Sequence, residues 1–239
     1  MDADKNLLRV KLFADGADLV SMVEMASKTY ISGLTTNPTL MRKAGITDYV
    51  KFAKEVLSEI KTKPISFEVF SDDFEEMKLQ GQEIASWANN VYVKVPITNT
   101  RGESTRHVIE YLVAKDVKVN VTALMTNKQV EEVIEILNPN IESYVSVFAG
   151  RIADTGRDPV PIMRECVTTL SINGKSELIW ASPRELLNIF QADAVGCQII
   201  TATNDILKKL ELVGYDLTKY SVDTVKMFFD DAKKAGYTF

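Results

Sequence analysis

Short apolar segments alternate with longer amphipathic ones along most of the chain. The apolar segments are rich in residues that favour strands, and each has the length of a buried strand. They cover 7–15, 31–36, 64–70, 91–98, 117–123, 144–150, 177–182 and 196–202. The stretches between them place apolar residues at helical spacing with polar residues opposite, which predicts helices. These patterns cover 18–30, 47–61, 72–88, 104–114, 127–137, 158–170, 182–192 and 204–213.

This alternation favours one fold. Strands that alternate with helices pair in parallel, and eight parallel strands close most economically into a barrel. No linker or low-complexity segment divides the 239 residues, a length that suits one domain of this type. We therefore expect an α/β fold, a single (β/α)8 TIM barrel over residues 1–239. A doubly wound open sheet is the alternative, but the first strand runs into "FADGADL", which has one glycine and no glycine-rich phosphate fingerprint.

A further amphipathic segment ends the chain. The stretch "SVDTVKMFFDDAKKAGYTF" at 221–239 predicts an additional C-terminal helix with a short aromatic tail. We expect its apolar residues Met227, Phe228 and Phe229 to pack on this barrel or a neighbouring one rather than to bind a cofactor.

Composition and charge narrow the partners. The chain has 28 Lys and Arg against 33 Asp and Glu, a formal charge of −5, and no basic cluster that suits nucleic acid or a membrane surface. Small molecules and other copies of the chain, in a homo-oligomer, are the expected partners. Two cysteines, Cys166 and Cys197, fit a reduced cytoplasm. The acidic "MDADKNLLRV" lacks a signal-peptide core, and no segment has the length to span a bilayer.

The histidine count removes two classes of catalytic site. His107 is the only histidine, and it lies in the polar helical stretch "GESTRHVIEY". A Ser-His-Asp triad and a multi-histidine metal site are therefore excluded unless this residue serves alone, and we expect it on the surface. Neither a metal site nor a cofactor is predicted.

One lysine interrupts an apolar strand. The stretch "NNVYVKVPIT" at 89–98 places Lys94 among Val, Tyr and Ile. Burying an ammonium is costly unless a partner compensates or the amine becomes neutral. Lys94 is therefore part of a structural ion pair, or a side chain whose buried alkyl stem carries the ammonium to water, or chemically active.

Polar residues also gather at the carboxyl ends of the other predicted strands, where a TIM barrel carries its active site. Each has a structural alternative, such as a helix cap, a turn hydrogen bond or a solvated loop. Together with Lys94 they would put two carboxylates at one rim of an apolar cylinder, which favours chemistry. The residues are Asp15, Asn37, Glu68, Asn120, Thr122, Ser146, Arg151, Ser182 and Arg184.

The order of these segments resembles the transaldolase family, including its small members related to fructose-6-phosphate aldolase. The resemblance rests on "FADGAD", "GLTTNPTL", "FEV", "VYVKVPIT", "VNVTALMTNKQ", "SVFAGRIAD" and "ASPR", which span nearly the whole chain. It implies that Lys94 is a Schiff-base nucleophile. It also implies transfer of a dihydroxyacetone unit between sugar phosphates of the pentose phosphate pathway.

The resemblance implies a role for each of the other candidates. Asp15 would assist at the C4 hydroxyl, and Glu68 would relay protons through a water that Thr122 helps to hold. A second group would bind the dihydroxyacetone unit and its imine: Thr36, Asn37, Asn120, Ser146 and Phe148. A third group would bind the phosphate: Arg151, Ser182 and Arg184. The two arginines have an alternative reading as loop ion pairs with Asp154 and Glu185.

Departures from the family pattern leave the substrate open. Pro183 stands where an aromatic or aliphatic residue is more usual, Glu185 directly follows Arg184, and Gly16 replaces a usual Thr. A nearby carboxylate would weaken phosphate attraction or tune it toward a sulfonate. Glu68 and Phe148 stand where free aldolases of the family carry Gln and Tyr, a pattern that resembles the transferases. A fructose-6-phosphate aldolase-like or sulfo-sugar transaldolase activity, and a non-catalytic binding or assembly role, are the alternatives.

Overall fold

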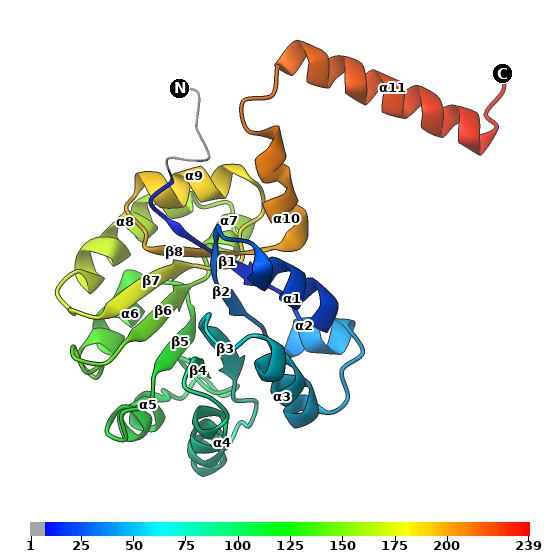
Figure 1. The fold of residues 1–239 in the computed structure, drawn as a ribbon. Helices are drawn as coiled ribbons and strands as arrows, with labels where there is room; N and C mark the ends of the chain where they lie inside the picture. The colour runs from blue at the N-terminus through cyan, green and yellow to red at the C-terminus, as the bar shows by residue number, and fades with distance from the viewer. Residues whose placement is uncertain (1–7) are drawn as a thin grey trace.

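Eight parallel strands close into a barrel in the order in which they occur along the chain (Figure 1). The computed structural model describes residues 8–239. The predicted barrel is confirmed, and each predicted apolar segment contributes one strand. The strands are β1 (Lys11–Asp15), β2 (Ile31–Thr35), β3 (Ile65–Glu68), β4 (Val91–Pro96), β5 (Val119–Leu124), β6 (Ser143–Val147), β7 (Ser176–Trp180) and β8 (Ile199–Thr203).

Helices surround the strands (Figure 1). Every predicted helical stretch contains a helix, and most have a side-chain N-cap, such as Asp18 for α1 and Asp73 for α4. The helices that cover the predicted stretches are α1 (Leu19–Ser27), α3 (Tyr49–Glu59), α4 (Phe74–Ser86), α5 (Arg106–Val113), α6 (Asn127–Ile134), α8 (Pro159–Leu170), α9 (Leu187–Ala194) and α10 (Asn204–Lys208). A 3-10 turn, Lys209–Leu212, continues α10.

Two short helices were not predicted, because six residues are too few to show a helical period. They are α2 (Pro38–Lys43) and α7 (Ala149–Asp154). For α2 a local signal was present, since Asn37 caps the helix and Pro38 occupies its first turn. Both helices directly follow a strand end, so they bring candidate residues to the mouth of the barrel.

The alternation of side chains along the strands separates two apolar clusters. Outward-facing residues pack beneath the helices and form the main core. Inward-facing residues form a smaller cluster that fills the barrel, with Phe13, Tyr92 and Tyr144 as its largest members. Tyr92 and Tyr144 stack with ring centroids 4.1 Å apart, and Phe13 meets Tyr144 edge-on at 5.6 Å. The interior is therefore a packed layer, and the inward positions nearer the strand ends are polar.

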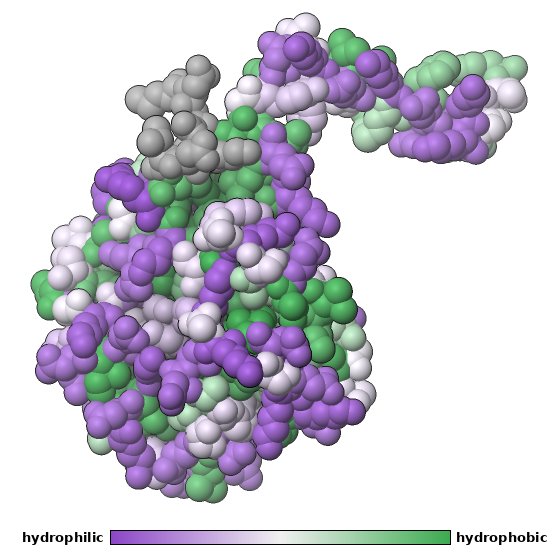
Figure 2. All heavy atoms as spheres, viewed as in Figure 1, coloured by the Kyte–Doolittle hydropathy of each residue, from purple (hydrophilic) through white to green (hydrophobic). Residues whose placement is uncertain are grey.

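The C-terminal helix does not pack on its own barrel. Helix α11 (Leu217–Ala235) extends away from the strands (Figure 1), and none of its residues is buried. Its apolar side chains are exposed beside hydrophilic ones (Figure 2), including Met227, Phe228 and Phe229. Of the two surfaces expected to cover these residues, this barrel does not do so, and packing on a neighbouring barrel stays a prediction. An amphipathic pattern identifies a helix but not the surface that covers its apolar face.

The termini and the surface complete the comparison with the sequence. The acidic N-terminal stretch on which the signal-peptide expectation rested lies largely in residues 1–7, outside the described residues. Within 8–239, no helix combines the length and apolar character needed to cross a membrane. His107 is exposed, as predicted, and packs edge-on against Phe74.

Candidate active site

A cavity of about 620 Å³ opens at the C-terminal mouth of the barrel. Nearly all candidate residues line it, although they come from seven different strand ends. Thr36 and Asn120 are not in its lining and are buried beside it. The candidates in the lining are Asp15, Asn37, Glu68, Lys94, Thr122, Ser146, Phe148, Arg151, Ser182 and Arg184. The structure thus brings the predicted residues together at the end of the barrel where the fold places active sites.

Lys94 lies at the bottom of this cavity with 6% of its surface exposed. Its Nζ is 3.1 Å from Glu68 Oε2 and donates a hydrogen bond to the carbonyl oxygen of Thr36 at 3.2 Å. Strand register produces this arrangement, because Glu68 and Lys94 are direct partners in the β3–β4 pair. Lys94 is therefore paired, yet its nitrogen borders a cavity large enough for a small substrate.

Asp15 is the second carboxylate near Lys94. Burial raises the pKa of Asp15 above its ordinary value, while the charge of Lys94 and a hydrogen bond from Thr35 act in the opposite direction and Glu68 adds to the rise. Thr35 Oγ1 donates to Asp15 Oδ1 at 2.8 Å, and Thr35 Oγ1 also lies 2.5 Å from Thr201 Oγ1. A raised pKa makes Asp15 a better proton acceptor than an exposed Asp, which suits acid–base chemistry.

A hydrogen-bonded row orients Asn120 next to Lys94. Asn120 Nδ2 donates to Ser66 Oγ at 3.0 Å, and Ser146 Oγ donates to Asn120 Oδ1 at 2.7 Å. Lys94 and Asn120 are register partners in the β4–β5 pair. Because both ends of the amide are engaged, its orientation is fixed. Ser146 also lines the cavity.

Among the buried hydroxyls that lack a hydrogen-bond partner in the described residues, two lie at or beside the cavity. They are Thr36 Oγ1 and Thr122 Oγ1. A buried hydroxyl without a partner is unfavourable unless water or a ligand satisfies it. The residue after Thr122, Ala123, has a φ of 65°, and the β5–β6 register shifts between Val121 and Leu124. This left-handed residue interrupts the strand at the cavity, so Thr122 is held at a point where a bound molecule could supply the missing contact.

On the rim of the cavity, helix α7 and the loop that follows β7 are in close contact. A Cβ added to Gly150 would lie 1.6 Å from the carbonyl oxygen of Ser182, so only glycine fits there. Ser182 itself has a φ of 60°. For this reason Ser182 does not cap a helix, and α9 begins later, at Leu187, than the sequence pattern predicted.

The two arginines on this rim differ in their partners. Arg184 Nε donates to Asp154 Oδ1 at 2.9 Å, and its Nη2 also contacts Asp154, which lowers the pKa of that carboxyl. Arg151 is exposed, lies 6.0 Å from the Phe148 ring centroid and has no ion pair within 8–239. The alternative of a loop ion pair is thus realised for Arg184 with Asp154. One edge of Arg184 and all of Arg151 stay available to an anion.

Asn37 caps a helix in addition to lining the cavity. Its Oδ1 accepts a hydrogen bond from Leu40 N at 3.0 Å and caps α2, as one of its two readings predicted. The side chain still lines the cavity. Asp15, in contrast, does not cap a helix, because Asp18 caps α1.

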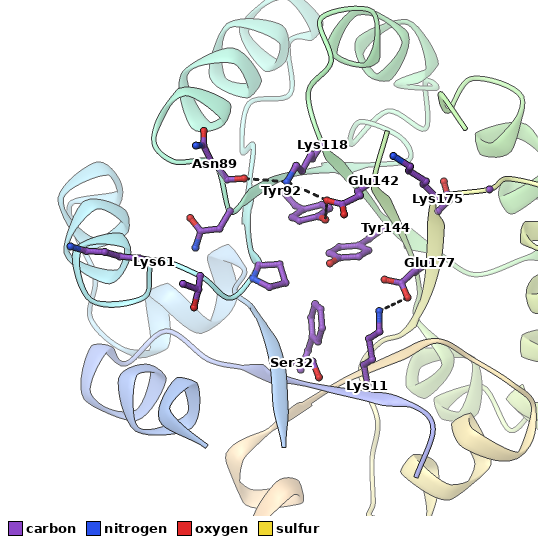
Figure 3. Close-up of a pocket in the computed structure, with 16 residues that line it drawn as sticks. Lys11, Ser32, Lys61, Asn89, Tyr92, Lys118, Glu142, Tyr144, Lys175 and Glu177 are labelled. Atoms are coloured by element: carbon purple, nitrogen blue, oxygen red, sulfur yellow. Dashed lines mark hydrogen bonds and ion pairs between the residues drawn. The ribbon is translucent and has the colours of Figure 1, made fainter. Parts of the chain in front are cut away.

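A second cavity, of about 830 Å³, lies at the opposite mouth of the barrel (Figure 3). Four lysines line it, but Lys11 pairs with Glu177 at 2.7 Å and Lys118 with Glu142 at 3.3 Å. Its floor is the buried layer of Phe13, Tyr92 and Tyr144. Alternating charges above a closed aromatic layer indicate a structural ion-pair network. Of these two cavities, only the one at the C-terminal mouth brings the candidate residues together.

Within 8–239, no group of three His, Cys, Asp or Glu residues is placed to hold a metal ion.

Sequence reasoning missed several residues around the cavity. Among them are Thr35, Thr201 and Ser66, whose hydroxyls hydrogen-bond to the candidates or to one another. A signal existed for Thr201, because it is a polar residue near the end of a buried strand, the same feature that identified Lys94.

The family comparison agrees with this geometry. Residues 12–238 match the family model described as "Transaldolase/Fructose-6-phosphate aldolase". The chain is 32% identical over 229 residues to a "Probable transaldolase" of Thermoanaerobacter sp. (strain X514), covering 95% of this chain and 99% of that one. It is 32% identical over 203 residues to a protein of the same name from Methanococcus maripaludis (strain C7 / ATCC BAA-1331), covering 84% and 89%.

Solved structures support the fold alone. The 4-hydroxy-tetrahydrodipicolinate synthase of Methylacidiphilum fumariolicum SolV gives a TM-score of 0.58 at 12% identity, covering 84% of this chain and 69% of that one. An HpcH/Hpal aldolase/citrate lyase family protein of Burkholderia cenocepacia J2315 gives 0.59 at 12% identity, covering 91% and 95%. From the barrel, the cavity and the match over 12–238, the chain belongs to the transaldolase/fructose-6-phosphate aldolase family and is an enzyme of the transaldolase type.

Proposed function

We propose that this enzyme transfers a dihydroxyacetone unit from a ketose phosphate to an aldose phosphate through a Schiff base on Lys94. The observation that carries the proposal is a lysine with 6% exposure whose nitrogen borders a cavity between two carboxylates. An amine attacks a carbonyl only after it has lost its proton, and Glu68, 3.1 Å from Lys94 Nζ, is placed to accept that proton.

The imine supplies the electron sink. The Lys94 amine adds to the C2 carbonyl of the ketose, and loss of water gives a protonated imine. The bond between C3 and C4 then breaks, with its electron pair moving onto the imine nitrogen, while Asp15 takes the C4 hydroxyl proton and the aldose leaves. Addition of the remaining three-carbon unit to a second aldehyde reverses these steps, and hydrolysis frees Lys94.

The other polar residues have roles that fit their contacts. Glu68 lies 3.1 Å from Lys94 and would move protons for imine formation through a water held by the unpaired hydroxyl of Thr122. Asn120, held by Ser66 and Ser146, would bind a substrate hydroxyl. Thr36, Asn37 and Ser146 would add further contacts, and Phe148 would pack against the bound intermediate.

The rim of Arg151, Ser182 and Arg184 would bind the terminal anion. Fructose 6-phosphate or sedoheptulose 7-phosphate would be the donor, with erythrose 4-phosphate or glyceraldehyde 3-phosphate as acceptor. Glu68 and Phe148 stand where free aldolases of the family carry Gln and Tyr. This pattern resembles the transferases and favours transfer over free aldol cleavage. One observation favours a second candidate: Asp154 already engages Arg184, which reduces its charge toward a doubly charged phosphate and suits a singly charged sulfonate. A sulfo-sugar transaldolase is therefore the alternative.

Borohydride trapping tests the proposal. The enzyme is incubated with fructose 6-phosphate, reduced and digested, and a three-carbon adduct is sought on Lys94 by mass spectrometry. The adduct is expected on Lys94, absent from Lys94→Met, and retained in Lys118→Met, a control at the opposite mouth of the barrel. An adduct on another lysine, or none with phosphorylated and sulfonated ketoses alike, would refute the imine mechanism.

Self-association is a further part of the proposal. Exposed apolar residues on α11, among them Val225, Phe228 and Phe229, have no cover in the described chain. We propose that residues 1–239 act as one barrel domain, that α11 contacts another copy in a homo-oligomer, and that the enzyme works in the cytoplasm. Light scattering behind gel filtration measures the mass, and a monomer at micromolar concentration would refute the oligomer.

A further inference from the structure

Two threonines form a hydrogen-bonded chain that ends at Asp15. Thr35 Oγ1 donates to Asp15 Oδ1 at 2.8 Å, and Thr201 Oγ1 lies 2.5 Å from Thr35 Oγ1. The three residues come from adjacent strands, because β1 pairs with β2 on one side and with β8 on the other. Both threonines are buried and both line the cavity.

The direction of this chain follows from the number of protons. A threonine hydroxyl has one hydrogen to donate and two lone pairs that accept. When Asp15 is ionised, it can only accept, so the hydrogen of Thr35 is committed to Asp15 Oδ1. The hydroxyl of Thr201 must then donate to Thr35. The chain therefore runs from Thr201 through Thr35 to Asp15.

A donor on Thr35 makes Thr35 a stronger donor to Asp15, because hydrogen bonds in series polarise one another in a buried site. We propose that Thr201 is a positioning residue that fixes the orientation and the charge state of the Asp15 carboxylate through Thr35. The inference rests on the proposed function only in giving Asp15 its role as the base.

The geometry also selects which oxygen reacts. Thr35 occupies Oδ1 of Asp15, and no described residue donates to Oδ2. Oδ2 is therefore the oxygen left to take the C4 hydroxyl proton. When it does, Asp15 becomes a neutral acid and the Thr35 bond to Oδ1 can persist. Proton transfer then needs no rearrangement of the buried threonines.

Other charged groups act on Asp15 and stay the same in the variants below. Lys94 and Glu68 face it across the barrel and have opposite effects on it. Asp18 at the start of α1 and Asp205 in α10 line cavities that Asp15 also lines. Removing only the Thr201 hydroxyl therefore changes the hydrogen-bond chain without changing any charge.

Carbon-13 NMR titration of the Asp15 carboxyl tests the inference without a substrate. The signal is assigned with Asp15→Asn and followed in the wild type, Thr201→Val and Thr201→Ser. Valine has the shape of threonine but no hydroxyl, whereas serine keeps the hydroxyl. We expect the midpoint to rise by about 0.5 to 1 pH unit in Thr201→Val. The serine variant should titrate like the wild type. If valine is not tolerated in the fold, Thr201→Ala makes the same comparison.

An unchanged midpoint in a folded Thr201→Val protein would overturn the inference, and so would an equal shift in Thr201→Ser. Because no turnover is measured, these results stand whether or not the enzyme is a transaldolase. In the background of Thr35→Val, Thr201→Val should have almost no further effect, since the chain is already broken. A full additional shift in that background would also refute action through Thr35.

Kinetics give the second readout. In Thr201→Val, kcat should fall about threefold to tenfold while KM is unchanged, and the acidic limb of the pH profile should move to higher pH. The limb moves this way because the ionised base is harder to form when a donor is lost. A rise in KM with an unmoved limb would indicate a structural role and refute the inference.

Discussion

Lys94 and Glu68 are direct register partners on neighbouring strands, with Nζ and Oε2 3.1 Å apart at the C-terminal, polar end of the barrel interior. Replacing one partner of a buried ion pair leaves the other without compensation. A substitution of Glu68 therefore changes the surroundings of the Lys94 amine while the amine itself is kept.

Glu68→Gln keeps the size of the side chain and removes the carboxylate. Because imine formation would lose its proton relay, we expect transfer to fall by about 10²-fold. The fraction of dihydroxyacetone released without an acceptor should rise, because free aldolases of the family carry Gln at this position. The measurement is rapid borohydride trapping with product analysis. Glu177→Gln at the opposite mouth is the control, and an effect of similar size there would contradict the assignment.

Asp15→Asn should stabilise the enzyme at neutral pH. Burial raises the pKa of Asp15, so the folded state binds a proton more tightly than the unfolded chain does. Stability is therefore lost as pH rises from the ordinary Asp value of 3.8 through the raised pKa. We expect Asn to gain about 1 kcal/mol at pH 7 and progressively less toward pH 3.8, measured by urea unfolding.

Asp18 should show the opposite dependence of stability on pH. Its hydrogen bonds with Ser21 lower its pKa, so its stabilisation is present above pH 3.8 and disappears as pH falls through the lowered pKa. Asp18→Ala should thus be destabilised at pH 7 and approach the wild type in acid. The same pH trend for both variants would show that the interpretation of Asp15 is wrong.

Gly150→Ala should disturb the anion rim. The added Cβ would overlap the Ser182 carbonyl oxygen at 1.6 Å, and this oxygen belongs to the backbone, which cannot move as freely as a side chain. We expect a loss of about 1–3 kcal/mol in the free energy of unfolding and a higher KM for phosphorylated donors. Gly16→Ala is the stability control, because its nearest contact is Met22 Cγ at 3.9 Å. Equal stability of the two variants would contradict the close packing.

Asp154→Asn should change how Arg184 meets the substrate. The carboxylate holds the guanidinium through Nε and Nη2, and the amide would hold it less firmly. We expect KM for phosphorylated donors to rise about threefold to tenfold, with kcat nearly unchanged. Glu185→Gln is the matched control, because its carboxylate makes no ion pair within 8–239. A lower KM for phosphorylated donors in Asp154→Asn would mean that Asp154 instead weakens phosphate binding, which is the outcome that the sulfo-sugar alternative expects.

Transfer should be insensitive to chelators. The proposed imine withdraws electrons from the breaking bond, so the reaction does not call for a Lewis acid. Full activity after dialysis against EDTA is the expected result. Loss of activity that returns on addition of a divalent cation would require a different mechanism.

The sequence by itself determined the barrel, because eight apolar segments separated by amphipathic ones have few other parallel arrangements. It also identified most of the cavity lining, since a polar residue near the end of a buried strand is conspicuous. Lys94 is the clearest example, because a charged side chain among Val and Tyr needs an explanation.

Only the tertiary structure decided the partners of these residues. The contacts of Thr201 with Thr35 and of Asp154 with Arg184 join strands and helices that are far apart in the chain. The contact of Gly150 with Ser182 likewise joins helix α7 to the loop that follows β7. Local pattern specifies which face of an element is apolar or polar. Which polar groups meet depends on strand register and loop geometry, and these are fixed when the barrel closes.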